Sequence, residues 1–156
     1  MIKMKTILHP TDFSESSNYA LKYAISLARE FESKLHLLHV VEDVSTMLCL
    51  EPCPVMPVAP VMTEMENRAR KALDQVLSPE ARGAISTECA LLRGVPFQEI
   101  IRYARQIQAD IIVCGTHGRT GLKHLLFGSV AENVVRNSPC PVLSVRHPEH
   151  KFEIPG

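Results

Sequence analysis

Three glycines and one serine near the C-terminus have the spacing of a phosphate-binding loop. Gly115 and Gly118 follow the apolar run Ile111–Cys114, and nine residues separate Gly118 from Gly128–Ser129. Because glycine has no Cβ, backbone N–H groups at such positions can approach an anion closely. A helix that opens at Gly128–Ser129 adds a hydroxyl and the positive end of its dipole. The pattern therefore predicts a site for phosphate groups in this loop.

The other side chains of the loop allow more than one interpretation. Arg119 and Lys123 can each supply positive charge to a triphosphate or remain solvated at the surface, and we favour Arg119 as a ligand. His117 is of a residue type that often acts as a general base, but a loop histidine is more often solvated or hydrogen-bonded. Gly121 is interpreted as a turn residue outside the site. We expect no catalytic residue here.

Better-known phosphate and metal motifs do not fit the spacing. A Walker A loop requires Gly-Lys-Ser/Thr together, and a dinucleotide fingerprint requires its glycines directly after the first strand. Cys49 and Cys53 are separated by three residues rather than two, and no second cysteine pair follows. His9, His36 and His39 lack cysteine or carboxylate partners at ligand spacing. We therefore expect no metal ligand among the side chains.

The composition sets the class of protein. The 156 residues include 17 basic and 17 acidic side chains, so no long-range field attracts nucleic acid or an anionic membrane. No apolar run approaches the roughly 20 residues of a membrane-spanning helix, and Thr6–Leu8 is too short for a signal peptide. The odd number of cysteines fits a reducing compartment. We expect one cytoplasmic domain over 1–156 that binds neither nucleic acid nor membrane.

Short apolar runs alternate with longer segments of helical periodicity, as in βαβ folds. Strands are predicted at Lys5–His9, Lys34–Val41, Ile85–Leu92, Asp110–Gly115 and Val142–Val145. Helices are predicted after an N-cap at Ser14, after a capping box of Thr63 and Glu66, from Pro96, and after Gly128–Ser129. Ser78–Pro79 is expected to end the second helix.

This alternation predicts an α/β fold with a five-stranded, parallel, doubly wound sheet, Rossmann-like, and with helices on both faces. Ligands of such sheets bind beyond the carboxyl ends of the strands. The segment 42–60 interrupts the alternation with proline, methionine and cysteine residues. Its prolines exclude a continuous helix, so we expect a long loop that packs on the fold or on a partner.

Together these motifs resemble the ATP-binding signature of the universal stress protein family. Gly115-x-x-Gly118, nine residues and Gly128–Ser129 match its glycines. The chain also resembles the family at Thr6–Ser14, His39–Val41, Arg93–Pro96, Ala109–Val113 and Ser138–Leu143. The resemblance covers nearly the whole chain. His124, where many members have arginine, and the 42–60 loop depart from it.

The resemblance implies an adenine nucleotide alpha hydrolase-like fold that holds ATP between the first and fourth strands. Asp12, which could equally cap the next helix, would lie near the ribose or base. The adenine side would comprise Pro10, Thr11, Asp12 and Val41, and the phosphate side Gly115, Thr116, His117, Gly118, Arg119, Gly128, Ser129 and Val130. Mg²⁺ would bridge phosphate oxygens. Members of the family pair as homodimers through the last strand, here Val142–Val145.

These features favour a nucleotide-responsive regulator in the stress response that acts on an unidentified protein partner and hydrolyses ATP slowly at most. An ATP hydrolase or nucleotidyl-transfer enzyme of the same fold is the alternative, for which the sequence offers no positioned nucleophile and base. A nucleotide-free interaction protein that uses the 42–60 loop is a third hypothesis. The three glycines argue against it.

Overall fold

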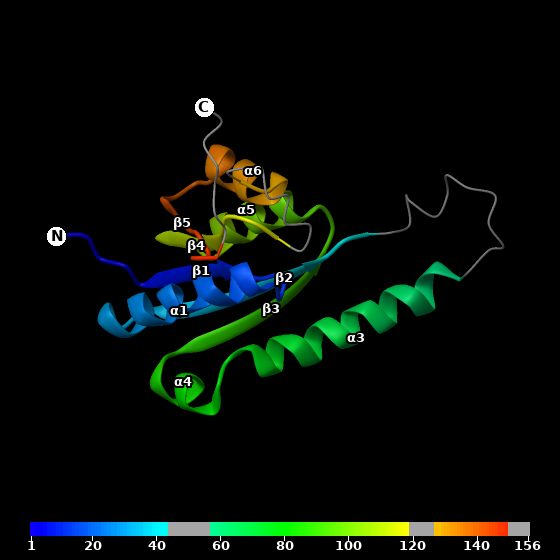
Figure 1. Cartoon of the computed structure of the whole chain (residues 1–156), viewed down its shortest axis with the longest axis horizontal. Coiled ribbons are helices and arrows are strands. Elements are labelled where there is room, and N and C mark those ends of the chain that lie inside the picture. The colour runs from blue at the N-terminus through cyan, green and yellow to red at the C-terminus, as the bar shows by residue number, and fades with distance from the viewer. Residues whose placement is uncertain (44–56, 119–126, 150–156) are drawn as a thin grey trace.

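The computed structural model describes residues 1–43, 57–118 and 127–149 (Figure 1). Its centre is a parallel sheet in the order β3-β2-β1-β4-β5. The strands are β1 (Thr6–Pro10), β2 (Lys34–Val41), β3 (Thr87–Arg93), β4 (Ile111–Gly115) and β5 (Val142–Val145). The helices are α1 (Glu15–Glu30), α3 (Val58–Val76), α4 (Pro79–Ala84), α5 (Pro96–Gln106) and α6 (Ser129–Asn137). The predicted doubly wound α/β fold is confirmed, with strand boundaries within two residues of those expected.

Helices cover both faces of the sheet because its central strands are apolar at consecutive positions. Ile7 packs with α1 and with Leu73 of α3, whereas Leu8 packs with Ile100 of α5 and Val134 of α6. Both β1 side chains are fully buried. Successive side chains of a strand point to opposite faces, so β1 contributes to two hydrophobic cores at once.

Three helix starts agree with the expectation from the sequence. Ser14 is the N-cap of α1, where its side chain accepts a hydrogen bond from Ser17 N. Pro96 is the first residue of α5, where its missing N–H leaves no hydrogen bond unmade. Helix α6 begins directly after Gly128. Each of these helices follows a strand, so the caps fix the ends of the loops at the carboxyl edge of the sheet.

The predicted 42–60 loop is wrong at its C-terminal end. Helix α3 begins at Val58, and 44–56 lies outside the described residues. Pro60 is in the first turn of α3, where backbone N–H groups have no intrahelical partner. A proline there breaks no hydrogen bond, so it is compatible with the helix.

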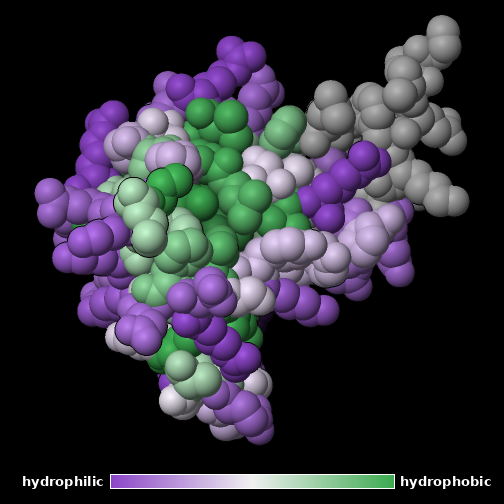
Figure 2. Space-filling model, turned by 90° about the vertical axis from the view of Figure 1, so that its left-hand side faces the viewer, coloured by the Kyte–Doolittle hydropathy of each residue, from purple (hydrophilic) through white to green (hydrophobic). Residues whose placement is uncertain are grey.

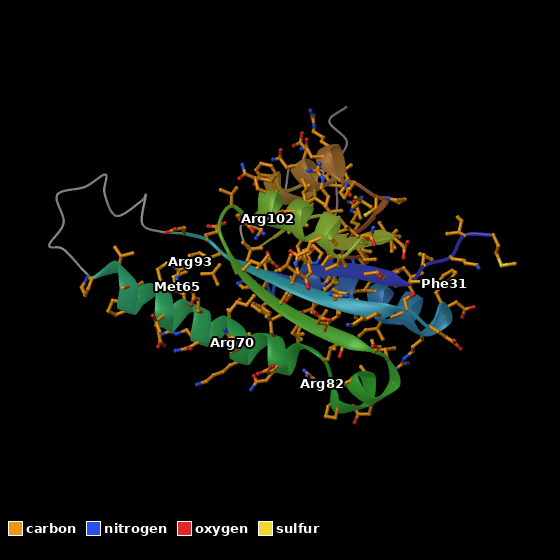
Figure 3. The ribbon with its side chains drawn as sticks, turned by 180° about the vertical axis from the view of Figure 1, so that it is seen from behind. Phe31, Met65, Arg70, Arg82, Arg93 and Arg102 are labelled. Carbon is orange, nitrogen blue, oxygen red and sulfur yellow. The ribbon has the colours of Figure 1, made fainter. Side chains whose placement is uncertain are left out.

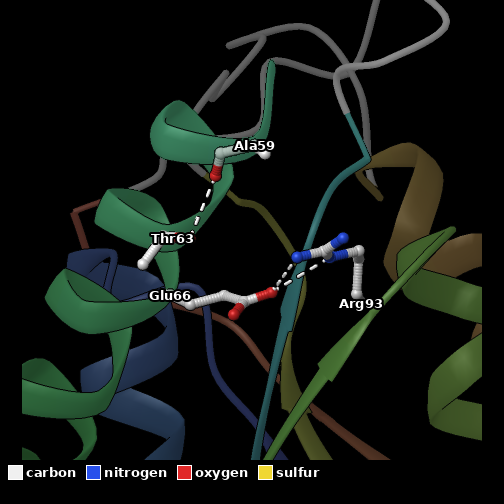
Figure 4. A network of polar contacts seen from close by, with 4 residues as sticks. All are labelled: Ala59, Thr63, Glu66 and Arg93. Carbon is white, nitrogen blue, oxygen red and sulfur yellow. Dashed lines mark hydrogen bonds and ion pairs between the residues drawn. The ribbon is translucent and has the colours of Figure 1, made fainter. Parts of the chain in front are cut away.

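The predicted capping box is also wrong. Thr63 lies within α3, and its hydroxyl donates to Ala59 O at 3.0 Å (Figure 4). Glu66 forms an ion pair with Arg93 at the end of β3. Neither side chain caps the helix: the Thr63 bond stays within α3, and the Glu66 ion pair ties α3 to the edge of the sheet.

Ser78–Pro79 ends α3 as predicted but also begins α4, which the sequence analysis missed. Ser78 is the N-cap of α4 and its Oγ accepts a hydrogen bond from Ala81 N at 3.2 Å. Proline follows it at the first helical position, as is typical of a helix start.

None of the helices in the described parts of the chain is long and apolar enough to cross a membrane.

Candidate functional site

The candidate site lies at the carboxyl ends of β1 and β4, where the strand order reverses. The chain runs from β1 outward through β2 to β3, then returns to place β4 and β5 on the other side of β1. The β1–β4 pairing covers only Ile7 with Ile111 and Leu8 with Ile112. Beyond these pairs the backbone pairing of the two strands ends, and open α/β sheets bind ligands at such places.

The loop after β1 is held by hydrogen bonds of its own side chains. Thr11 N donates to Leu38 O at 2.8 Å, which extends the pairing of β1 with β2. Thr11 Oγ1 accepts from Phe13 N at 3.0 Å and from the Ser17 hydroxyl at 2.9 Å. Thr11 is buried, so these bonds fix the start of the loop against α1.

Asp12 forms a local turn and also approaches the loop after β4. Its Oδ1 accepts a hydrogen bond from Ser14 N at 3.0 Å, so Asp12 supports the start of α1, while Ser14 is the N-cap itself. A Cβ added to Gly118 would lie 2.7 Å from Asp12 Oδ2, closer than such atoms can approach. The fold therefore brings the acidic turn and Gly118 together although they are far apart in sequence.

Gly115 has a different surrounding from Gly118. A Cβ at Gly115 would lie 2.6 Å from Ser16 Oγ and 3.0 Å from Ser16 backbone atoms at the start of α1. The missing side chain thus lets the helix pack closely on β4. Thr116 N donates to Val145 O at 3.2 Å and is part of the sheet. Close approach of a helix is therefore one reason for Gly115, and its predicted approach to an anion stays a prediction.

The residues that follow Gly115 turn inward. Thr116 and His117 are both buried, and Thr116 Oγ1 is 3.0 Å from His117 Nδ1. His117 is therefore hydrogen-bonded, in line with one of the two interpretations of its side chain. Gly118 is the last described residue before the gap, and Arg119, Lys123 and Gly121 lie outside the described residues.

The start of α6 closes the same region. Gly128 N donates a hydrogen bond to Thr116 O at 2.7 Å, and Gly128 O accepts one from Glu132 N at 3.0 Å. Gly128 is the N-cap and has no side chain to cap the helix. The N–H groups of Ser129 and Val130 lie in the first turn, where the helix itself offers them no carbonyl partner. Both residues are exposed, so this helix end presents donors and a positive dipole end.

On the β2 side, an apolar cluster borders the loop after β1. Val41 is buried with Met62 and Ala69 of α3, and Phe13 packs against this cluster. The ring of Phe13 lies 4.6 Å from that of His39, centroid to centroid, and His39 Nδ1 is 2.7 Å from Thr11 O. Val41 therefore lies near the loop, as expected, but α3 covers its side chain.

The sequence does not single out Phe13 and Met62, because apolar side chains carry no chemical signature. Phe13 adopts a positive φ of 63°, a conformation that non-glycine residues rarely adopt. Its position directly after Asp12 is the only sequence signal for its role. Met62 belongs to the helix start that was predicted as loop, so it could not be placed.

His9 is the buried titratable group nearest to this region on β1. Its side chain is fully buried, and its Nδ1 is 2.7 Å from Val113 O on β4. Burial lowers the pKa of His9 to about 4, although the hydrogen bond to Val113 and the charge of Asp12 act in the opposite direction. No group of three or more His, Cys, Asp or Glu side chains suited to a metal occurs within residues 1–43, 57–118 and 127–149.

Comparison with known proteins gives the relationships of the chain. Residues 3–146 match the universal stress protein family. Universal stress protein MJ0531 of Methanocaldococcus jannaschii is 38% identical over 93% of this chain and 84% of its own length. YxiE of Bacillus subtilis is 32% identical over 86% of this chain and 94% of its own.

Solved structures agree with the sequence relatives. The structure of MJ0577 has a TM-score of 0.76 and 28% identity, and covers 95% of this chain and 99% of that one. A universal stress protein in complex with cAMP has a TM-score of 0.62 and 28% identity, with 93% and 98% covered. The sequence match over most of the chain and the shared fold lead to one conclusion: this chain belongs to the universal stress protein family.

Proposed function

We propose that this chain binds ATP and acts as a nucleotide-responsive regulator in the stress response, with slow ATP hydrolysis at most. The observation that carries the proposal is the approach of Gly118 to Asp12, since a Cβ at Gly118 would lie 2.7 Å from Asp12 Oδ2. A carboxylate suited to hydroxyl groups and a loop suited to phosphates thus lie side by side, and the proposed binding site along them is called the crevice below.

The two sides of the crevice would divide the nucleotide between them. Pro10, Thr11 and Asp12 border the adenosine, with Val41 behind them in the apolar cluster. Asp12 Oδ2 accepts from a ribose hydroxyl while Oδ1 remains bonded to Ser14 N. An acceptor that is already oriented by its own turn loses little conformational freedom on binding.

The phosphates would lie against Gly118 and the start of α6. Ser129 and Val130 offer first-turn N–H groups there, and Thr116 and His117 support the loop from beneath. Gly115 contributes by letting α1 pack against β4. Arg119 would be a further ligand on the phosphate side, where it would add positive charge. Mg²⁺ fits here through the phosphate oxygens, because this ion keeps several waters and needs few protein ligands.

A relative supports a nucleotide as the ligand. A universal stress protein 28% identical to this chain has been solved in complex with cAMP. We assign ATP because Gly118 adjoins both Asp12 and Gly128 at the N-terminus of α6, an order that suits a nucleoside followed by a chain of phosphates. Regulation is favoured over rapid catalysis because the site as described is built from backbone groups and a carboxylate engaged in a turn.

We further propose that the chain forms a homodimer through Val142–Val145 in the cytoplasm and signals to a protein partner. Strand β5 is the end of the sheet beside β4, and Val142 and Leu143 are only half-buried. On the side of the molecule seen in Figure 2, hydrophobic residues gather in one area bordered by polar ones. Such areas are typical of surfaces that contact another protein. Sedimentation velocity of the purified protein tests the proposal, which expects the mass of a dimer.

The deciding experiment is the release of bound nucleotide. The purified protein is denatured and the supernatant is chromatographed, and ATP binding is then measured by calorimetry on nucleotide-free protein. Co-purified adenine nucleotide together with saturable ATP binding supports the proposal. Absence of both results overturns it in favour of a nucleotide-free interaction protein. Phosphate release above about 1 s⁻¹, in the range of ordinary enzymes, would instead assign an ATP hydrolase.

A further inference from the structure

The ladder between β1 and β4 lacks a donor directly below the candidate site. In a parallel pair, a residue donates to the residue before its partner and accepts from the residue after it. Leu8 pairs with Ile112, so the next donor from β1 toward β4 would be the N–H of residue 10, aimed at Val113 O. Residue 10 is proline, which has no N–H. The backbone alone would leave the buried Val113 carbonyl without this bond.

The side chain of His9 takes the position of that missing donor. His9 Nδ1 lies 2.7 Å from Val113 O, within ordinary hydrogen-bond distance. Because a carbonyl oxygen can only accept, Nδ1 must carry the proton in this contact. The geometry thus assigns the Nδ1–H tautomer and makes the imidazole a link between the two strands.

The other ring nitrogen shows that packing alone does not explain a histidine here. His9 Nε2 and Ser16 Oγ are the buried side-chain atoms without a hydrogen-bond partner among the described residues. An unmade hydrogen bond at a buried atom costs roughly 1–3 kcal/mol, a cost that an aliphatic residue of similar size would avoid. The hydrogen bond to Val113 O therefore explains why this position holds a histidine and not an aliphatic residue.

We propose that His9 is a positioning residue of the nucleotide site, whose Nδ1–H replaces the absent Pro10 N–H on Val113 O and fixes the spacing of β1 and β4. His9 lies three residues before Asp12, and Val113 lies two before Gly115, so this link sets the width of the crevice. The inference rests on the proposed function for its ligand, whereas the hydrogen bond can be tested without any ligand.

The test is a double-mutant cycle on the full chain. H9L removes the donor and keeps an aliphatic volume, H9N keeps an N–H donor near the position of Nδ1, and P10A returns the backbone N–H. ATP affinity is measured by calorimetry for H9L, H9N, P10A and H9L/P10A. We expect H9L to weaken ATP binding about tenfold, the equivalent of one buried hydrogen bond. H9N should stay within about threefold of wild type, and H9L/P10A within about threefold of P10A, since either change restores a donor.

A second readout is the ¹⁵N spectrum of the imidazole in wild-type protein without nucleotide. A proton on Nδ1 supports the proposal, and a proton on Nε2 overturns it. Wild-type affinity in H9L, or equal losses for H9L in the presence and absence of Pro10, would also overturn it. If H9L fails to fold, the H9N affinity and the tautomer decide. If wild type binds no nucleotide, the proposed function fails, while the tautomer and the same cycle measured in unfolding free energy still test the role of His9.

Discussion

The loops that meet at the candidate site are built in opposite ways. The loop after β1 is fixed by its own side chains, through Thr11 Oγ1, Asp12 Oδ1 and the capping Ser14. The described part of the loop after β4 is instead shaped by missing side chains, at Gly115 and Gly118. One side therefore offers an oriented carboxylate and the other offers bare backbone. A ligand with hydroxyl groups at one end and anionic oxygens at the other fits such a pair.

The glycines of the second loop do not share one role. Gly115 makes room for Ser16 of α1, and Gly118 makes room for Asp12. A Cβ at Gly128 would meet its nearest neighbours only at 3.6 Å or beyond, which is ordinary contact. A motif that looks uniform in the sequence thus divides into a packing position, a site position and a position with steric tolerance.

The largest effect is expected for Gly118→Val. The new side chain would collide with the Asp12 carboxylate and enter the crevice, so we expect ATP affinity to fall by at least about a thousandfold, or about 4 kcal/mol, while the protein stays folded. Calorimetry measures the affinity and circular dichroism the fold. Gly83→Val is the matched control, because nothing lies within 4 Å of a Cβ there. Unchanged affinity in Gly118→Val would refute the assignment of the crevice.

Acid should destabilise the fold at His9, because protonation places a positive charge on a fully buried side chain. His9 has a folded pKa of about 4, compared with 6.5 for an unperturbed histidine. The unfolded chain therefore binds a proton below about pH 6.5 that the folded chain refuses until about pH 4. The His9 contribution is complete above pH 6.5 and falls by up to about 3 kcal/mol as the pH drops toward 4.

The measurement is urea unfolding of wild type and H9N between pH 7 and 4. Asparagine does not titrate, so the difference between the two pH profiles isolates His9 from the carboxylates, which titrate in both proteins. Wild type should lose stability more steeply than H9N over this range. Parallel profiles would mean that His9 is charged or accessible in the folded state.

Gly115→Ala should act on stability before it acts on binding. Its Cβ would meet Ser16 at 2.6 Å and the Ser16 backbone at 3.0 Å, so helix α1 must shift. Overpacking of this kind costs about 2 kcal/mol in unfolding free energy, measured by urea titration. Gly128→Ala is the comparison within the same motif and should cost about 1 kcal/mol at most, because its Cβ fits but alanine is a poorer N-cap than glycine. Equal effects of the two substitutions would contradict the division of roles.

The smallest effect concerns the first loop. Ser14→Ala removes the side-chain cap of α1 and should cost about 1 kcal/mol of unfolding free energy. Ser78→Ala removes the cap of α4, away from the crevice, and should cost a similar amount. Only Ser14→Ala should also weaken ATP binding, because Asp12 Oδ1 is bonded to Ser14 N at the same turn. If both variants bound ATP equally well, the N-cap of α1 would have no role in ATP binding.

Much of the fold could be predicted because it follows from local patterns. Alternating apolar runs located the strands, and Ser14, Pro96 and Gly128 marked helix starts, since each signal involves neighbours in the chain. The start of α3 was missed because Pro60 suggests loop unless it is known to occupy a first turn. That distinction depends on where the helix packs, which no local pattern contains.

The site could be predicted less completely. The glycine spacing indicated the loop, and the structure places Gly118 beside Asp12, while nucleotide binding by these residues stays a prediction. The contact of Gly115 with Ser16 and that of His9 with Val113 join residues about a hundred positions apart. Such pairs arise from the register of β1 with β4, and the residue types alone do not predict that register.

The two borders of the sheet differ in a way that limits the size of any assembly. Figure 3 shows arginines on the elements around β3, among them Arg70, Arg82, Arg93 and Arg102, and β3 itself carries Glu88 and Arg93 in ion pairs with Lys34 and Glu66. Adding a strand beside β3 would disturb these charges, whereas β5 carries Val142 and Leu143. Copies joined head to tail, β5 against β3, would grow into a filament. The charged border opposes that growth, so copies that met through β5 alone would stop at a closed pair.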